Sequence, residues 1–181
     1  MKATGIVRRI DDLGRVVIPK EIRRTMRIRE GDPLEIFTDK DGEVIFKKYS
    51  PIGELGEFAS TYAETLSKTV GVPVCITDKD NIIAVSGAPK KELSEKPISS
   101  DLEKIMQEKT TFVAKPNENK KVPLIEGMDK YVAGVVVPII AEGDPIGSVV
   151  ILNPEDGTPP GETEAKVAQS AAGFLGKQME S

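Results

Sequence analysis

The stretch Asp11-Asp-Leu-Gly-Arg-Val-Val-Ile-Pro19 decides the fold of the amino-terminal part of this 181-residue chain. Its first four residues are typical of a turn, in which Gly14 supplies backbone conformations that other residues adopt only at a cost. Residues 15–18 are mostly β-branched and indicate a short strand. Pro19 suits the first turn of a helix, so we expect a helix over 20–27.

The segments on either side of this stretch predict more strands. Residues 4–10 indicate a strand before the turn. After the helix, two strands are expected over 34–38 and 43–48. The residues between them, Asp39-Lys-Asp-Gly42, end in the Asp-Gly pair that favours a tight hairpin.

Residues 1–50 form a domain that is too small to be stable as a single copy. Ile22 and Met26 lie four residues apart in the expected helix and would face its core. Four short strands and one helix nevertheless bury little apolar surface. Because the motif occurs once in the chain, a second chain must complete the domain, which we therefore predict to be an obligate dimer.

The charges of the chain are sorted by position. All seven arginines lie between Arg8 and Arg29, and residues 1–29 hold nine basic and three acidic side chains. Residues 51–181 hold 13 basic and 20 acidic side chains, a net charge of −7. A basic amino-terminal domain on an acidic remainder is typical of a nucleic-acid-binding protein, so nucleic acid is the expected partner.

The remainder of the chain predicts a second α+β domain over 56–181, after a linker at 51–55. We expect helices over 54–70, from the capping box Ser100–Glu103 to about residue 109, and over 162–180, with strands over 72–78, 82–86, 110–115, 130–140 and 146–152. The strands are mostly antiparallel, and the first and last helices can lie on one face of their sheet. The final helix would point Val167, Ala168, Ala171, Phe174, Leu175 and Met179 inward.

Missing residue types exclude several kinds of chemistry. The chain has no histidine and one cysteine, which excludes histidine-based catalysis, His-ligated metals and thiolate zinc clusters. It also lacks a phosphate-binding loop motif. We therefore expect no enzymatic activity, no cofactor and no metal. Cys75 lies in an apolar strand pattern and is expected to be buried and inert.

Nothing in the sequence indicates a membrane protein. The longest apolar stretch, Tyr131–Ala141, is too short to span a bilayer. The amino terminus runs directly into charged residues, so no signal for secretion is indicated. One cysteine rules out an intrachain disulfide, which fits a cytoplasmic protein.

The amino-terminal residues resemble the AbrB family of bacterial transition-state regulators. The likeness rests on Met1-Lys-Ala-Thr-Gly-Ile-Val-Arg8, on the stretch 11–19 and on Glu21-Ile-Arg-Arg24. It continues past this domain, where the chain is similar to the sporulation regulators of that family. The segments concerned are 32–37, 47–51, 84–87, 143–147 and 171–175.

The resemblance implies properties that composition and spacing do not reach. It implies an AbrB-like head over 1–50, built as a swapped-hairpin β-barrel, a GAF-like domain over 56–181, and a tetramer. It also implies an activator and repressor of transcription in the developing forespore, located in the cytoplasm and associated with the nucleoid.

Five arginines are the predicted DNA-binding residues: Arg8, Arg9, Arg15, Arg23 and Arg24. A dimer would present two copies of this set about a two-fold axis, which matches a palindromic duplex. Strand alternation sends Arg8 and Arg9 to opposite faces and does not choose between them, whereas the resemblance favours Arg8. The short helix predicts phosphate contacts, a few guanine contacts and sensitivity to DNA shape rather than a strict base code.

Other roles remain open for several basic residues. Arg24 could form an intrahelical ion pair with Glu21. Arg27 and Arg29 could simply favour the carboxyl end of the helix. Lys47 and Lys48 could guard an exposed strand edge against aggregation.

Two interpretations remain open for the second domain, and one rival function for the whole chain. The domain could sense a small-molecule effector, or it could be a scaffold whose terminal helices build the tetramer. The rival function is an antitoxin, which shares this kind of head but usually carries a disordered tail. The periodic pattern of 162–180 argues instead for a folded carboxyl end.

Overall fold

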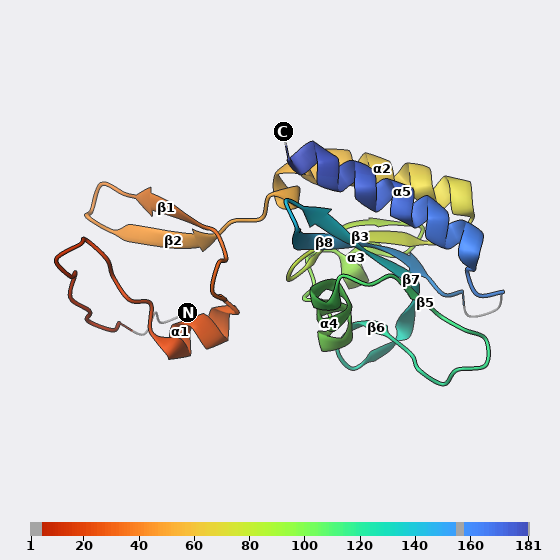
Figure 1. Cartoon of the computed structure of the whole chain (residues 1–181), viewed down its shortest axis with the longest axis horizontal. Coiled ribbons are helices and arrows are strands. Elements are labelled where there is room, and N and C mark those ends of the chain that lie inside the picture. Colours follow the sequence, from red (N-terminus) through yellow and green to blue (C-terminus); the bar gives the residue numbers. More distant parts are fainter. Residues whose placement is uncertain (1–4, 155–157, 181) are drawn as a thin grey trace. The chain divides into compact units, whose positions relative to one another are not determined.

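The computed structural model describes residues 5–154 and 158–180. It divides the chain into two compact units, residues 1–49 and 50–181, which we call the head and the body (Figure 1). None of the helices in the described part of the chain is long and apolar enough to cross a membrane.

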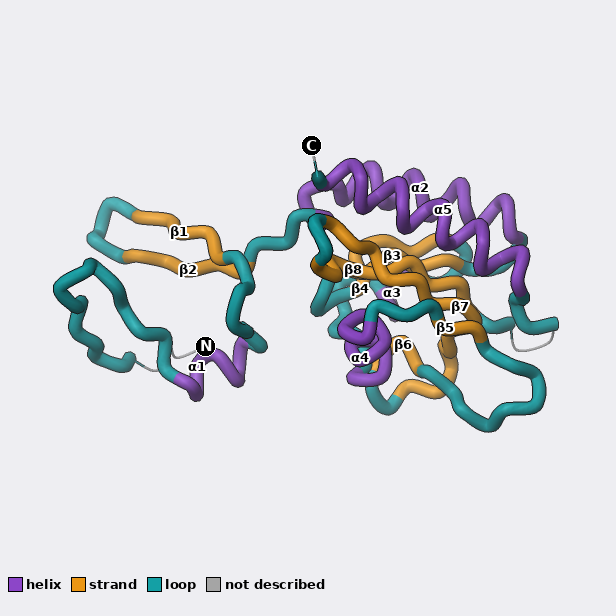
Figure 2. The backbone as a smooth tube through the Cα atoms, viewed as in Figure 1, coloured by secondary structure: helices purple, strands orange, loops and turns teal. Residues whose placement is uncertain are grey.

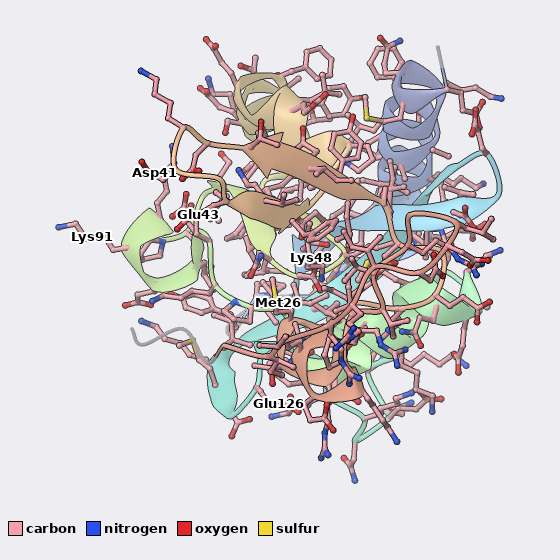
Figure 3. The ribbon with its side chains drawn as sticks, turned by 90° about the vertical axis from the view of Figure 1, so that its left-hand side faces the viewer. Met26, Asp41, Glu43, Lys48, Lys91 and Glu126 are labelled. Atoms are coloured by element: carbon pink, nitrogen blue, oxygen red, sulfur yellow. The ribbon has the colours of Figure 1, made fainter. Side chains whose placement is uncertain are left out.

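The head contains one helix and one hairpin: α1 (Lys20–Met26), β1 (Leu34–Thr38) and β2 (Val44–Lys48). The strands pair antiparallel, as predicted, with Ile36 opposite Phe46. Gly42 has a φ of 84°, which the turn requires, and the Asp39 carboxylate accepts hydrogen bonds from the backbone N–H groups of Asp41 and Glu43. The latter two residues mark the end of the hairpin in Figure 3.

The two strands predicted over 4–10 and 15–18 are wrong for the single chain. Residues 5–10 and 15–18 carry no strand pairing, and residue 4 lies outside the described residues. The turn between them does form, because the Asp11 N–H donates to the Arg15 carbonyl at 3.0 Å and the Gly14 N–H to the Asp11 carbonyl at 3.1 Å. A strand needs a neighbour for its hydrogen bonds, and the head of one chain does not supply one here.

The described residues of the head also form no apolar core of their own. Helix α1 buries no residue, and Met26 is 44% exposed, so the predicted inward orientation of Ile22 and Met26 does not hold in the single chain. The hairpin exposes apolar side chains on both faces, with Ile36 63% exposed on one and Phe37 46% exposed on the other. Apolar residues on both faces of a two-stranded sheet require cover that is not in this unit.

The body is built on an antiparallel sheet with the strand order β4-β3-β8-β7-β5. The strands are β3 (Val74–Asp78), β4 (Ile82–Ser86), β5 (Phe112–Val113), β7 (Met128–Ala141) and β8 (Asp144–Leu152), and β6 (Pro123–Ile125) pairs with β7. Glu142 and Gly143 connect β7 to β8 with φ values of 50° and 85°. This left-handed pair suits the right-handed twist of a two-residue hairpin.

Helices cover both faces of this sheet (Figures 1 and 2). As predicted, the first and last helices of the body, α2 (Gly56–Val70) and α5 (Glu162–Met179), lie on one face, where Ala63 and Ala168 pack with Ile76. On the other face, α3 (Lys90–Leu93) and α4 (Ser100–Glu108) pack against Cys75 and Val150. Neighbouring strand residues alternate between the two cores, as the period of two requires.

Several details differ from the sequence prediction. The cap of α4 is Ser99, whose Oγ accepts from the Leu102 N–H and donates to the Pro123 carbonyl, so the predicted box at Ser100 is one residue late. The expected linker at 51–55 instead starts the body, because residues Ile52–Leu55 form a 3-10 helix and Ile52 is fully buried. Phe174, predicted inward, is 43% exposed, and α3 and β6 were not predicted.

Candidate nucleic-acid interface

The five predicted arginines are all exposed, and they come from two segments of the head. Arg8 and Arg9 precede the turn at 11–14, and Arg15 follows it, while Arg23 and Arg24 lie on α1. The extended residues 16–18 join the two segments, and Pro19 caps the helix. The head therefore gathers its guanidinium groups on a turn and on the helix directly after it.

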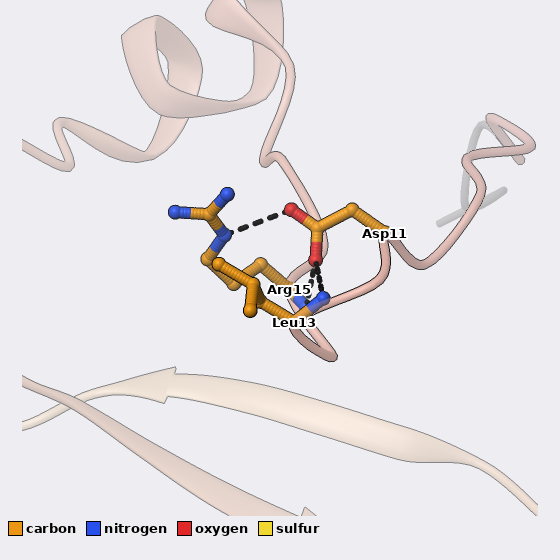
Figure 4. Close-up of polar contacts among 3 residues, drawn as sticks. All are labelled: Asp11, Leu13 and Arg15. Atoms are coloured by element: carbon orange, nitrogen blue, oxygen red, sulfur yellow. Dashed lines mark hydrogen bonds and ion pairs between the residues drawn. The ribbon is translucent and has the colours of Figure 1, made fainter.

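The turn fixes the direction of Arg15 through one carboxylate (Figure 4). Asp11 Oδ1 accepts hydrogen bonds from the backbone N–H of Leu13 at 2.9 Å and of Arg15 at 2.8 Å, and Oδ2 accepts from Arg15 Nε at 2.8 Å. The backbone N–H of Arg15, followed by its guanidinium, holds the pKa of Asp11 below its usual value. The carboxylate is therefore charged wherever DNA binding would be measured.

Helix α1 fixes Arg23 in a similar way. Arg23 Nε donates to the Ile18 carbonyl at 3.1 Å, and the Arg23 N–H donates to the Pro19 carbonyl at 3.0 Å. Among the described residues no ion pair joins Glu21 to Arg24, so the alternative role considered for Arg24 is not supported. Arg24, like Arg23, is exposed.

The end of α1 is held by contacts that the sequence did not suggest. Arg27 adopts the left-handed conformation with a φ of 54°, and its carbonyl accepts a hydrogen bond from Lys48 Nζ at 3.1 Å. The Arg29 N–H donates to Asp32 Oδ2 at 2.9 Å. Lys48 thus links the hairpin to the end of the helix. This is a structural role in addition to the protection of an exposed strand edge that the sequence suggested.

Sequence reasoning missed Asp11 as well. Asp11 and Arg15 are four residues apart, which signals an ion pair on a helix but not across a turn. The signal that could have revealed the contact is the preference of aspartate to accept backbone N–H groups two residues later. Arginine type and charge sorting identified the cations, but not the carboxylate that holds one of them.

The body offers no comparable chemistry among its described residues. Cys75 is buried, as predicted, and burial raises the pKa of its thiol to about 12. Within 5–154 and 158–180, no three His, Cys, Asp or Glu side chains converge as a metal ion would require. The Tyr131 hydroxyl donates to the Glu92 carboxylate on the surface, which accounts for the polar group of this half-buried tyrosine.

Three aromatic rings from α2 and α5 lie close together. Tyr62 and Phe174 stack with ring centroids 5.8 Å apart, and Phe58 lies 6.1 Å from Tyr62 and 6.2 Å from Phe174. Phe58 and Phe174 are each 43% exposed. We call these three residues the aromatic cluster; it is the largest group of stacked rings among the described residues.

Both units match known families. A family model described as the carboxyl-terminal domain of stage V sporulation protein T, a transcription factor, matches residues 54–180. A model described as antidote-toxin recognition MazE, a bacterial antitoxin, matches residues 7–53.

Individual relatives cover the whole chain or one unit of it. Stage V sporulation protein T of Bacillus subtilis (strain 168) is 57% identical over 181 residues, or 99% of each chain. The transition state regulatory protein AbrB of the same organism is 63% identical over 51 residues, 28% of this chain and 52% of the relative. The GAF domain of an Acinetobacter phosphoenolpyruvate-protein phosphotransferase covers 69% of this chain and 81% of its own, with a TM-score of 0.56 and 13% identity. The predicted GAF-like fold of the body is thereby confirmed.

Proposed function

The chain belongs to the stage V sporulation protein T family of transcription factors, and from this premise we propose that its head binds duplex DNA to regulate sporulation genes. The observation that carries the proposal is the sorting of arginine: all seven lie within the head, and the five predicted contacts are exposed. The close identity of this segment to AbrB supports it. The family is one of transcription factors, and this supports our proposal of a regulator, not an enzyme, that acts in the cytoplasm on the nucleoid.

The DNA-binding form is a dimer of heads. Two features support this: the hairpin exposes apolar residues on both faces, and the extended residues 5–10 and 15–18 have no strand partner. A second copy with the same needs would supply both the cover and the hydrogen bonds, as in a swapped-hairpin barrel. The dimer presents two sets of Arg8, Arg9, Arg15, Arg23 and Arg24 about a two-fold axis.

The body acts chiefly as the scaffold of a tetramer. The aromatic cluster supports this role, because large exposed rings on adjacent helices favour packing against another apolar surface. Within the described residues every buried side-chain polar atom has a hydrogen-bond partner, so none is left waiting for a ligand. These observations favour a scaffold over the small-molecule sensor that the sequence left open.

The antitoxin alternative fits the chain less well. The match of residues 7–53 to an antitoxin model supports a shared kind of head. The body, however, is a folded GAF-like domain with two buried cores and not a disordered tail. A folded body that matches a transcription-factor model favours regulation of genes over capture of a toxin.

The test is a salt titration of the full chain with a labelled duplex, followed by fluorescence anisotropy. The logarithm of the binding constant should fall steeply with that of salt concentration, by about 0.9 per phosphate neutralised. Replacement of Arg23 by Ala removes one contact from each head and should flatten the slope by about 2. Lys166→Ala, an exposed lysine of α5, is the matched control and should leave the slope unchanged. A flat titration of the unmodified chain refutes the proposal, and dissociation of Arg23→Ala dimers would make Arg23 structural.

A further inference from the structure

Two of the predicted DNA-binding arginines share an unusual restraint. Arg15 donates its Nε–H to Asp11 Oδ2 at 2.8 Å, and Arg23 donates its Nε–H to the Ile18 carbonyl at 3.1 Å. In both cases the acceptor comes from the same head, four or five residues away. Among the described residues, the terminal nitrogens Nη1 and Nη2 of both side chains have no acceptor.

This restraint decides which edge of each guanidinium is available. A free arginine can offer either its Nε–Nη edge or its Nη1–Nη2 end to a pair of acceptors. With Nε engaged, only the end that carries Nη1 and Nη2 remains, and it extends from a side chain that is 68% exposed at Arg15. Figure 4 shows the contact between the Asp11 carboxylate and Nε of Arg15, with no contact drawn to either terminal nitrogen.

An arginine that is already restrained loses less conformational entropy when it binds a ligand. An unrestrained arginine loses rotamer freedom when it contacts a ligand, and that loss opposes binding. Three hydrogen bonds at Asp11 already order the turn and its arginine before any ligand arrives. The side chain is therefore preorganised for acceptors that approach it end-on.

We propose that Asp11 is a positioning residue for DNA binding, which holds Arg15 so that its two terminal nitrogens meet a phosphate or the O6/N7 edge of a guanine. The Ile18 carbonyl performs the same task for Arg23. The inference rests on the proposed function of the head, because it assigns a role to a group that would not touch DNA itself. An acidic residue thereby contributes to the recognition of an anion.

Electrostatic attraction alone predicts that loss of the Asp11 carboxylate strengthens DNA binding, whereas positioning predicts that it weakens binding. This difference makes the inference testable. Removing one carboxylate from each head adds positive charge, so simple charge attraction predicts tighter binding and a steeper salt dependence. Positioning predicts weaker binding, because the freed Arg15 must be ordered again by the duplex. The direction of the change in affinity therefore distinguishes the two.

The experiment compares Asp11→Asn with Asp12→Asn in the full chain. The asparagine Oδ1 at position 11 can still accept the Leu13 and Arg15 N–H groups, but its amide cannot accept from Arg15 Nε, so the turn is kept and the restraint is lost. Asp12, exposed and adjacent, gives the same change of charge. We expect Asp11→Asn to lower the affinity for a duplex about tenfold, since two ordered side chains are lost per dimer, and Asp12→Asn to leave it unchanged or raise it.

A double-mutant cycle separates positioning from a general structural role. In an Arg15→Ala background, Asp11→Asn should not weaken binding further, because Asp11 positions only Arg15, and only the effect of the lost charge, the same as for Asp12→Asn, should remain. Equal affinities of Asp11→Asn and Asp12→Asn overturn the inference, as does an equally large effect of Asp11→Asn when Arg15 is absent. If the unmodified chain does not bind DNA at all, the proposed function has failed. If it binds and Arg15→Ala weakens it while Asp11→Asn does not, only the positioning role has failed.

Discussion

Gly176 brings α5 into close contact with the backbone of β7, and replacing it by alanine should destabilise the body. A Cβ at this position would lie 2.2 Å from the carbonyl oxygen of Ile140 and 3.2 Å from its carbon. The obstacle is the backbone of β7, whose Ile140 pairs with Pro145 of β8. A flexible side chain could move aside, but a backbone carbonyl in a paired strand cannot.

The change in the free energy of unfolding follows from two opposing effects, the steric clash of the new Cβ and the higher helix propensity of alanine. Ordinary contact begins at 3.4 Å, so α5 must rise by about 1 Å over a surface built from small residues, including Ala168 and Ala172. Overpacking of this kind costs about 1–3 kcal/mol, and a clash with backbone belongs at the upper end. The higher helix propensity of alanine relative to glycine stabilises the helix by about 1 kcal/mol. We expect a net loss of about 2 kcal/mol in the free energy of unfolding of the body.

Gly173 of the same helix provides the matched control. It is exposed, and a Cβ there meets no atom within 4 Å, so Gly173→Ala should gain the propensity term alone, about 1 kcal/mol. Urea unfolding of the full chain, followed by far-ultraviolet circular dichroism and by hydrogen exchange of β7 and α5, measures both variants. If Gly176→Ala is as stable as Gly173→Ala, α5 does not lie on β7 as described and the reasoning is refuted.

Two further predictions concern the body. Because burial raises the pKa of the Cys75 thiol to about 12, no thiolate forms in mildly alkaline buffer, so iodoacetamide should label the native chain very slowly and urea-unfolded chain rapidly; rapid labelling of the native chain would contradict the buried position. Phe174→Glu places a charge in the aromatic cluster and should convert tetramers into dimers that persist through the heads, as read by light scattering. Tetramers that survive this change would move the interface elsewhere.

The accuracy of the sequence prediction depends on where each element finds its partner. The hairpin around Asp39–Gly42 and the strands over 72–78 and 82–86 were predicted correctly, because each strand pairs with a neighbour in the same chain. The strands over 4–10 and 15–18 were predicted from equally good β-branched patterns, and the described residues 5–10 and 15–18 form no strand. No described strand of the chain pairs with them, and a pattern of residue types carries no information on that point.

In the candidate site too, some features follow from residue type alone and others depend on contacts that form only in the fold. Residue type and position alone separate all seven arginines from the acidic body, and the choice of five of them as DNA contacts stays a prediction. The restraint on Arg15 could not be predicted, because it depends on the dihedral angles of a turn that bring Asp11 Oδ2 to Nε. Phe174 was misplaced for a similar reason: it lies at the border of the apolar stripe of α5, where period alone does not separate a core from an interface.

The contrast between head and body has a thermodynamic consequence for the proposed function. The body has two apolar cores inside one chain, so it does not need a second chain to form them. The head leaves residues such as Ile36 and Phe37 uncovered, so on the proposed model its folding and its dimerisation are one equilibrium. The paired set of ten arginines that two heads present then exists only in the dimer. DNA that binds the dimer must therefore also favour dimerisation. Any contact between bodies that holds chains together raises the effective concentration of heads and therefore strengthens DNA binding without touching DNA.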